Sequence, residues 1–171
     1  MSRFIQEDER AADLSEVRSD EQLDWQALET WLKTHVAESS GLNPDANMLV
    51  SQFHGGHANL TYCVRFGDLE LVVRRPPKGN IAPGAHDMHR EYRVLKGLAP
   101  VYRQAPTVFA FCDDTSIIGA PFIVVERRRG VIVRAEVPAS LQVHNNVAER
   151  ISYALIDAMR DLHALDPEAI G

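Results

Sequence analysis

A glycine-rich turn is the first part of the sequence that could do chemistry. The segment His54-Gly55-Gly56-His57-Ala58-Asn59 lies between two runs that are typical of β-strands. Two glycines let the main chain approach a ligand closely, and successive N–H groups in such a turn can bind phosphate oxygens. A Gly-Gly turn that only joins two strands is the commoner meaning of this pattern by itself. The glycines therefore indicate an anion site only when other residues support it.

Arg74 and Glu91 provide that support. In the run Leu69–Arg75 the period of two places Arg74 on the same face as Val72, so a cation lies at the end of an otherwise apolar strand. Glu91 lies on the apolar stripe of the helix expected at 87–98, which Asp87 can cap. A buried cation and a buried carboxylate are each costly unless they are paired. We predict a direct ion pair between the two; the alternative is two solvated surface charges that never meet.

The elements that must position these residues follow a simple order. The pattern predicts a helix over 20–41, a meander of three strands, the helix 87–98, two or three further strands and a last helix over 146–165. The strand runs are MLVSQF, LTYCVRF and LELVVRR, then TVFAFC and PFIVVER, with VIV as a short sixth. This order is typical of an α+β domain in which one helix covers an antiparallel sheet of about five strands.

Composition excludes several classes of function. The chain has 171 residues, with 18 Lys and Arg against 24 Asp and Glu, and its net charge of -6 argues against general nucleic-acid binding. No apolar run is long enough to span a membrane, and the start is acidic where a signal peptide is apolar, so we expect a cytoplasmic protein with no membrane partner. Cys63 and Cys112 lie in strand-like runs and are expected to be buried thiols.

Several segments in order resemble the aminoglycoside phosphotransferase family, especially its branch of small-molecule kinases found alone or fused to acyl-CoA dehydrogenases. They are QFHGGHANLTY, LVVRRPPKG, AHDMHREYRVLKGL, IGAPFIVVERRRG and LIDAMRDLHALDPEAIG. The resemblance implies a protein-kinase-like amino-terminal lobe, ATP as cofactor and a small-molecule acceptor. It divides the chain into a polar tail at 1–20, a nucleotide-binding lobe with its hinge at 21–130, and at 131–171 a linker and the first helix of an incomplete second lobe.

The resemblance also implies a role for each site residue. Gly55, Gly56 and Asn59 would form the phosphate loop, Arg74 would replace the usual third-strand lysine with Glu91 as its partner, Val72 would face the adenine, and the main chain of Glu126 and Arg128 would bond the adenine edge. His57 and Ala58 depart from the Gln-Ser of that branch. No His-Gly-Asp occurs in the chain, so we assign no catalytic residue, expect Mg²⁺ to need the missing lobe, and predict that the chain alone does not transfer phosphate.

Three other readings remain open. The pairs His54/His57 and His86/His89 have a spacing that metal ligands use, although no cysteine has ligand spacing, and we assign no metal site. The chain can also be a non-catalytic binding or interaction module derived from such a kinase, or a fragment of one. Finally, the apolar stripe of the helix over 146–165 is broad enough to need cover, so we expect the isolated chain to pair this helix with a second copy or to aggregate.

Overall fold

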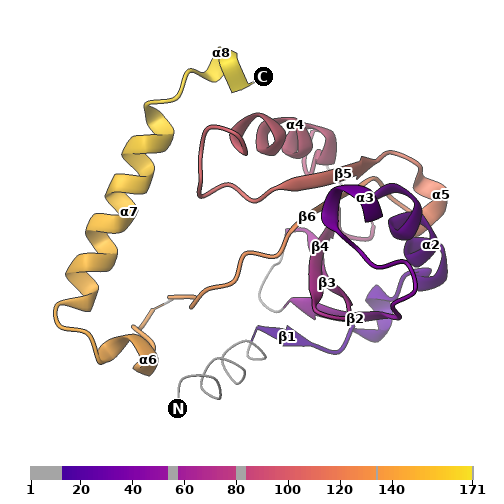
Figure 1. Cartoon of the computed structure of the whole chain (residues 1–171), viewed down its shortest axis with the longest axis horizontal. Coiled ribbons are helices and arrows are strands. Elements are labelled where there is room, and N and C mark those ends of the chain that lie inside the picture. The colour runs from indigo at the N-terminus through magenta and orange to yellow at the C-terminus, as the bar shows by residue number, and fades with distance from the viewer. Residues whose placement is uncertain (1–12, 54–57, 80–83, 134, 171) are drawn as a thin grey trace.

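An antiparallel sheet forms the centre of the protein (Figure 1). The computed structural model describes residues 13–53, 58–79, 84–133 and 135–170, and in these the sheet has six strands in the order β1-β2-β3-β4-β6-β5. The strands are β1 (Leu14–Ser15), β2 (Met48–Phe53), β3 (Leu60–Phe66), β4 (Leu69–Arg75), β5 (Val108–Cys112) and β6 (Phe122–Glu126). The predicted α+β class is confirmed, and the bounds of β2, β3 and β4 coincide with the runs seen in the sequence.

Helices cover both faces of the sheet, whereas the sequence analysis expected one covering helix. The first face carries Leu71 and Val73 and packs against α2 (Trp25–His35), whose Leu28 and Leu32 are fully buried. α3 (Ala37–Ser40) follows α2 and ends at Gly41 in the left-handed conformation. The apolar stripe of α2 can be read from its sequence, but the surface that it covers depends on contacts that are distant along the chain.

The second face carries Val72 and Arg74 and is covered by α4 (Met88–Leu98). The Asp87 carboxylate accepts a hydrogen bond from the Arg90 N–H at 2.9 Å, which caps the helix where the sequence predicts its start. Met88 is buried and packs against Val72 in a cluster with Ile123 and Val125. The part of this face under α4 is therefore apolar, and Arg74 lies at its border.

Three short elements differ from the expectations. Leu14–Ser15 pairs with Phe53 and Gln52 as an edge strand, and a 3₁₀ turn, η1 (Ser19–Glu21), follows it, in a stretch expected to be a polar lead-in. α5 (Thr115–Ile118) occupies the turn expected between β5 and β6, because the Asp114 carboxylate accepts from the Ser116 N–H and caps a helical turn. The stretch 131–133 is not a strand. Each of these elements is too short to produce a periodic pattern.

The carboxyl-terminal helices lie beside the sheet domain (Figure 1). An extended segment leads from β6 to α6 (Ala139–Gln142) and α7 (Val147–His163), and α8 (Pro167–Ile170) returns to α4. The Tyr102 hydroxyl donates to the Ala158 carbonyl of α7 at 3.0 Å. Five large apolar side chains of α7 are between 37% and 61% exposed: Tyr153, Leu155, Ile156, Met159 and Leu162. Among the helices described, none is both long and apolar enough to cross a lipid bilayer.

Candidate functional site

Arg74 and Glu91 form the predicted ion pair. Arg74 Nη1 lies 3.0 Å from Glu91 Oε1, which joins the end of β4 to the first turn of α4. The two side chains are 36% and 23% exposed, so the pair lies at the border between the apolar second face and solvent. The alternative of two separate surface charges is wrong. An ion pair in this position fixes the guanidinium on one wall of the space between sheet and helix.

Asn59 and His86 complete the polar cluster around Arg74. With the Asn59 amide oriented to satisfy both of its ends, its oxygen accepts from Arg74 Nη2 at 3.0 Å and its nitrogen donates to His86 Nδ1 at 2.7 Å. His86 precedes α4 with a positive φ of 57°, a conformation that turns the chain just before the helix cap. The sequence indicated Asn59 through the glycine turn, but it indicated His86 only as a potential metal ligand.

The polar cluster borders a cavity of about 590 Å³ between β3, β4, β6 and α4. Its lining combines this cluster with apolar side chains from the helix and the sheet: Asn59, Arg74, His86, Asp87, Arg90, Glu91, Val94, Leu95, Pro106 and Val125. Arg74 Nε is buried and has no hydrogen-bond partner among the described residues. The Arg74 side chain as a whole is 36% exposed and lines the cavity, and a guanidinium there fits an oxyanion such as a phosphate group.

The residues predicted to contact adenine lie further along the same face. Val72 is only 8% exposed because it packs against Ile123 and Val125 under Phe53. The Glu126 N–H donates to the Thr107 carbonyl at 2.8 Å, and its carboxylate accepts from the Thr107 N–H, which lowers the pKa of Glu126. The predicted roles of these residues stay predictions.

Three predicted site residues, Arg128, Gly55 and Gly56, are not part of the described polar cluster. Arg128 is exposed, and its guanidinium binds the Glu126 carboxylate at 3.1 Å and the Arg103 carbonyl. Gly55 and Gly56 of the predicted phosphate loop lie outside the described residues. Among the described residues, the site therefore consists of the polar cluster around Arg74 and the part of the same face that carries Val72.

The histidine pairs do not form a described metal site. His86 precedes α4 whereas His89 lies on it, with its ring edge-on to Phe111 at 5.4 Å between centroids, so the two do not share a helical face. His54 and His57 lie outside the described residues. Within the parts of the chain that the structure describes, no three metal-binding side chains come together.

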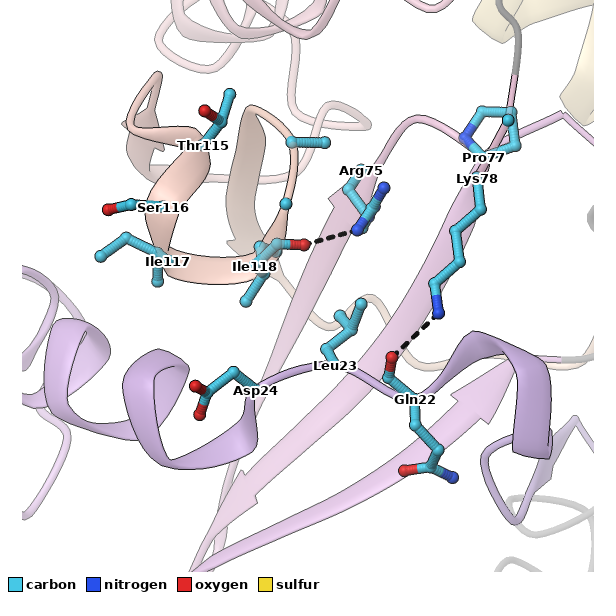
Figure 2. Close-up of a pocket in the computed structure, with 13 residues that line it drawn as sticks. Gln22, Leu23, Asp24, Arg75, Pro77, Lys78, Thr115, Ser116, Ile117 and Ile118 are labelled. Carbon is cyan, nitrogen blue, oxygen red and sulfur yellow. Dashed lines mark hydrogen bonds between the residues drawn. The ribbon is translucent and has the colours of Figure 1, made fainter.

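A second cavity, of about 600 Å³, opens on the other face of the sheet around Arg75 (Figure 2). Arg75 is 5% exposed, and its guanidinium donates to the Pro76 carbonyl at 2.9 Å and to the Ile118 carbonyl at 2.6 Å. Burial lowers the pKa of Arg75. Across the cavity Lys78 Nζ donates to the carbonyl of Gln22 at 3.0 Å. Arg74 and Arg75, adjacent in sequence, thus serve opposite faces of the sheet.

Comparison with known proteins places this geometry in a family. The model of the phosphotransferase enzyme family named APH matches residues 49–171, which include the ion pair, the cavity and α7. The chain belongs to the APH phosphotransferase family. The family resemblance stated from the sequence motifs is thereby confirmed for most of the chain.

Relatives of this APH chain include much longer proteins. It is 35% identical over 143 residues to mouse acyl-CoA dehydrogenase family member 10, covering 84% of this chain and 13% of the relative. It is 30% identical over 159 residues to human acyl-CoA dehydrogenase family member 11, covering 93% of this chain and 20% of the relative. The APH chain therefore spans a fifth or less of the length of these two proteins.

A solved structure supports the kinase-like architecture of the APH chain. A candidate aminoglycoside phosphotransferase from Ralstonia eutropha JMP134 matches with a TM-score of 0.66 and 30% sequence identity. The match covers 88% of this chain and 41% of the solved one. The fold described above is therefore shared with the corresponding part of a larger kinase-like protein.

Proposed function

We propose that the chain is the nucleotide-binding part of an ATP-dependent small-molecule phosphotransferase of the APH type. The observation that carries the proposal is the Arg74 guanidinium, held on the cavity wall by Glu91 at 3.0 Å and by Asn59 at 3.0 Å, with the side chain still 36% exposed. Kinase-like sites use a cation of this kind to bind phosphates and an acid from the covering helix to position it.

Each residue of the cluster has a defined task under this proposal. ATP supplies the phosphoryl group, and Arg74 would contact its phosphate oxygens through the part of the guanidinium that Glu91 and Asn59 leave exposed. Glu91 balances the charge of Arg74 and limits its rotamers. Asn59, held in turn by His86 Nδ1 at 2.7 Å, orients the other edge of the guanidinium. Val72, Glu126 and Arg128 would contact the base.

The proposal assigns nucleotide binding to these residues and phosphoryl transfer to none of them. The sequence has no His-Gly-Asp segment, which in the resembled family carries the catalytic base. Neither an acceptor nor Mg²⁺ is positioned by any residue named here, and positioning provides most of the catalysis in such enzymes. The acceptor is proposed to be a small molecule, and its identity belongs to parts of the protein outside this cavity.

A second candidate function is a non-catalytic interaction module. The exposed face of α7 favours it, because Leu155 and Ile156 are 61% and 59% exposed. Apolar side chains grouped in this way are typical of surfaces that are covered by another protein. This candidate needs no nucleotide, so a binding measurement separates it from the first.

Isothermal titration calorimetry with ADP tests the proposal. We expect ADP to bind the wild-type chain, and Arg74→Ala to weaken binding about tenfold or more, because a charge-assisted hydrogen bond contributes roughly 1.5 to 3 kcal/mol. Glu91→Gln should weaken binding less, since it leaves the guanidinium in place. Arg93→Ala, an exposed arginine of the same helix, is the matched control and should bind as the wild type does. Equal affinities for the Arg74 and Arg93 variants would contradict the proposal.

A further inference from the structure

Arg127, directly after β6, has an unusual position for an arginine. Its side chain is only 10% exposed, and its guanidinium lies 4.4 Å from the centre of the Phe53 ring. Phe53 ends β2 and packs against the apolar cluster of the second face, the one with Arg74. The guanidinium and the ring thus cover the part of this face that lies beyond the open cavity.

Two carboxylates fasten the guanidinium over the ring. Arg127 Nη2 donates to both oxygens of Asp13, at 3.2 and 3.1 Å. Glu70 Oε2 lies 3.7 Å from Arg127 Nε and 3.1 Å from Arg129 Nη2. Arg127 Nε is buried and has no hydrogen-bond partner among the described residues. We call Asp13, Phe53, Glu70 and Arg127 together the latch.

Phe53 of the latch packs against the cluster that contains Val72, the residue predicted to face adenine. Val72 is 8% exposed and belongs to the cluster on which Phe53 packs, while the cavity beside Arg74 is open. A flat ring in van der Waals contact needs about 3.5 to 4 Å to the next plane on each side. A separation of 4.4 Å between the guanidinium and the Phe53 ring leaves no space for a base between them.

We infer that the latch closes the nucleobase end of the site and opens when a nucleotide binds, so that Asp13 and Glu70 control affinity for the base and leave affinity for phosphate unchanged. This inference rests on the proposed function. It makes Asp13, the residue before β1, part of the binding site, although Asp13 and Arg127 are 114 positions apart in the sequence. In the closed state a ligand reaches Arg74 but not Val72.

A closed state lowers apparent affinity by the fraction of molecules that are open. Removing one fastening carboxylate raises that fraction. We therefore expect Asp13→Asn to bind ADP about three to ten times more tightly than the wild type, because hydrogen bonds between charged groups at a partly exposed site fall at the lower end of their usual strength. Tripolyphosphate has no base, so its affinity should not change.

The rate at which the Cys63 thiol is alkylated measures opening of the latch in the absence of nucleotide. It pairs across the sheet with Val72 and is 3% exposed. Burial raises the pKa of the Cys63 thiol to about 11, and the charges of Glu70, Arg127 and Asp13 also act on it. An open latch should admit alkylating reagents to this thiol. Cys112, buried with the core cluster of the first face, is an internal reference for general unfolding.

The experiment compares four proteins: wild type, Asp13→Asn, Arg127→Ala, and Asp113→Asn as an exposed acid that is not in the latch. Calorimetry measures ADP and tripolyphosphate, and mass spectrometry measures the alkylation rates of Cys63 and Cys112 in the absence of ligand. We expect both latch variants to bind ADP more tightly, to bind tripolyphosphate as the wild type does, and to show faster alkylation of Cys63 alone.

The failures of the two proposals can be told apart. If wild type binds ADP and the latch variants bind it equally well or more weakly, with Cys63 alkylated at the wild-type rate, the latch is wrong and the proposed function stands. If neither the wild type nor any variant binds ADP, both proposals are wrong. Faster alkylation of Cys112 in Arg127→Ala would indicate unfolding, and the Asp13→Asn result then decides.

Discussion

Replacing Arg74 and Arg75 one at a time should separate an effect on ADP binding from an effect on the stability of the fold. The two residues are adjacent, but Arg74 faces the cavity with Glu91 whereas Arg75 is 5% exposed on the other face. The perturbations are Arg74→Met and Arg75→Met, which keep an unbranched apolar stem and remove the guanidinium. We expect the first to weaken ADP binding at nearly unchanged stability. The second should destabilise the fold at nearly unchanged ADP affinity.

The magnitudes follow from the partners of each guanidinium. Arg75→Met leaves the carbonyls of Pro76 and Ile118 without their donor. An unsatisfied buried acceptor costs about 1 to 3 kcal/mol, and because Arg75 and Ile118 line the cavity in Figure 2, where water can enter, we take the lower end for each carbonyl, or about 2 kcal/mol in total. The Arg74–Glu91 pair is partly exposed and should contribute about 1 kcal/mol or less.

Urea unfolding and calorimetry with ADP on the same preparations measure both quantities. The expected loss of 2 kcal/mol for Arg75→Met corresponds to a fall in melting temperature of roughly 4 to 8 °C for a chain of this size. The reasoning would be refuted if Arg74→Met lost more unfolding free energy than Arg75→Met. It would also be refuted if Arg75→Met abolished ADP binding while its unfolding curve stayed unchanged.

Three further predictions concern other parts of the structure. Burial raises the pKa of Tyr62 from 10.0 to about 12, so the folded state holds this proton more tightly than the unfolded state does. The stability that Tyr62 contributes is therefore full below pH 10 and falls as the pH rises toward 12. In urea titrations over that range, Tyr62→Phe should lose less unfolding free energy than the wild type. A Cβ at Gly97 would overlap the Ile170 carbonyl, so Gly97→Ala should release α8 from α4 and speed hydrogen exchange there. Light scattering over a dilution series should show concentration-dependent association that Leu155→Glu with Met159→Glu abolishes without lowering the melting temperature; a wild-type monomer at every concentration would contradict this.

The sequence predicts the central strands and the ion pair well, for a local reason. In β4 the alternation of apolar side chains places Arg74 on one face, and Asp87 marks the start of α4 through its cap. Both signals extend over only a few residues. Because an isolated cation and an isolated carboxylate on apolar faces need each other, the pairing of Arg74 with Glu91 follows from two local patterns.

The parts that the sequence does not predict depend on contacts or on very short elements. Asp114 fits both a turn and a helix cap, and only the packing of Ile118 decides for α5. The latch joins Asp13 to Arg127 across 114 positions, and nothing near either residue indicates the other. Asn59 was expected near phosphate, but its bond to Arg74 requires the register Thr61↔Arg74 between β3 and β4.

The strand order has a consequence for the protein as it leaves the ribosome. β6 inserts between β4 and β5, and the pairing of Leu71 with Glu126 closes a long stretch of chain that contains Arg74, α4 and most of the cavity lining. The meander of β2, β3 and β4 can pair early because its turns are short. The cavity obtains its wall at Val125 only when β6 has been synthesised, after the entropy of closing this loop has been overcome. A nascent chain that ends before β6 therefore has the Arg74 strand and the Glu91 helix, but no pocket.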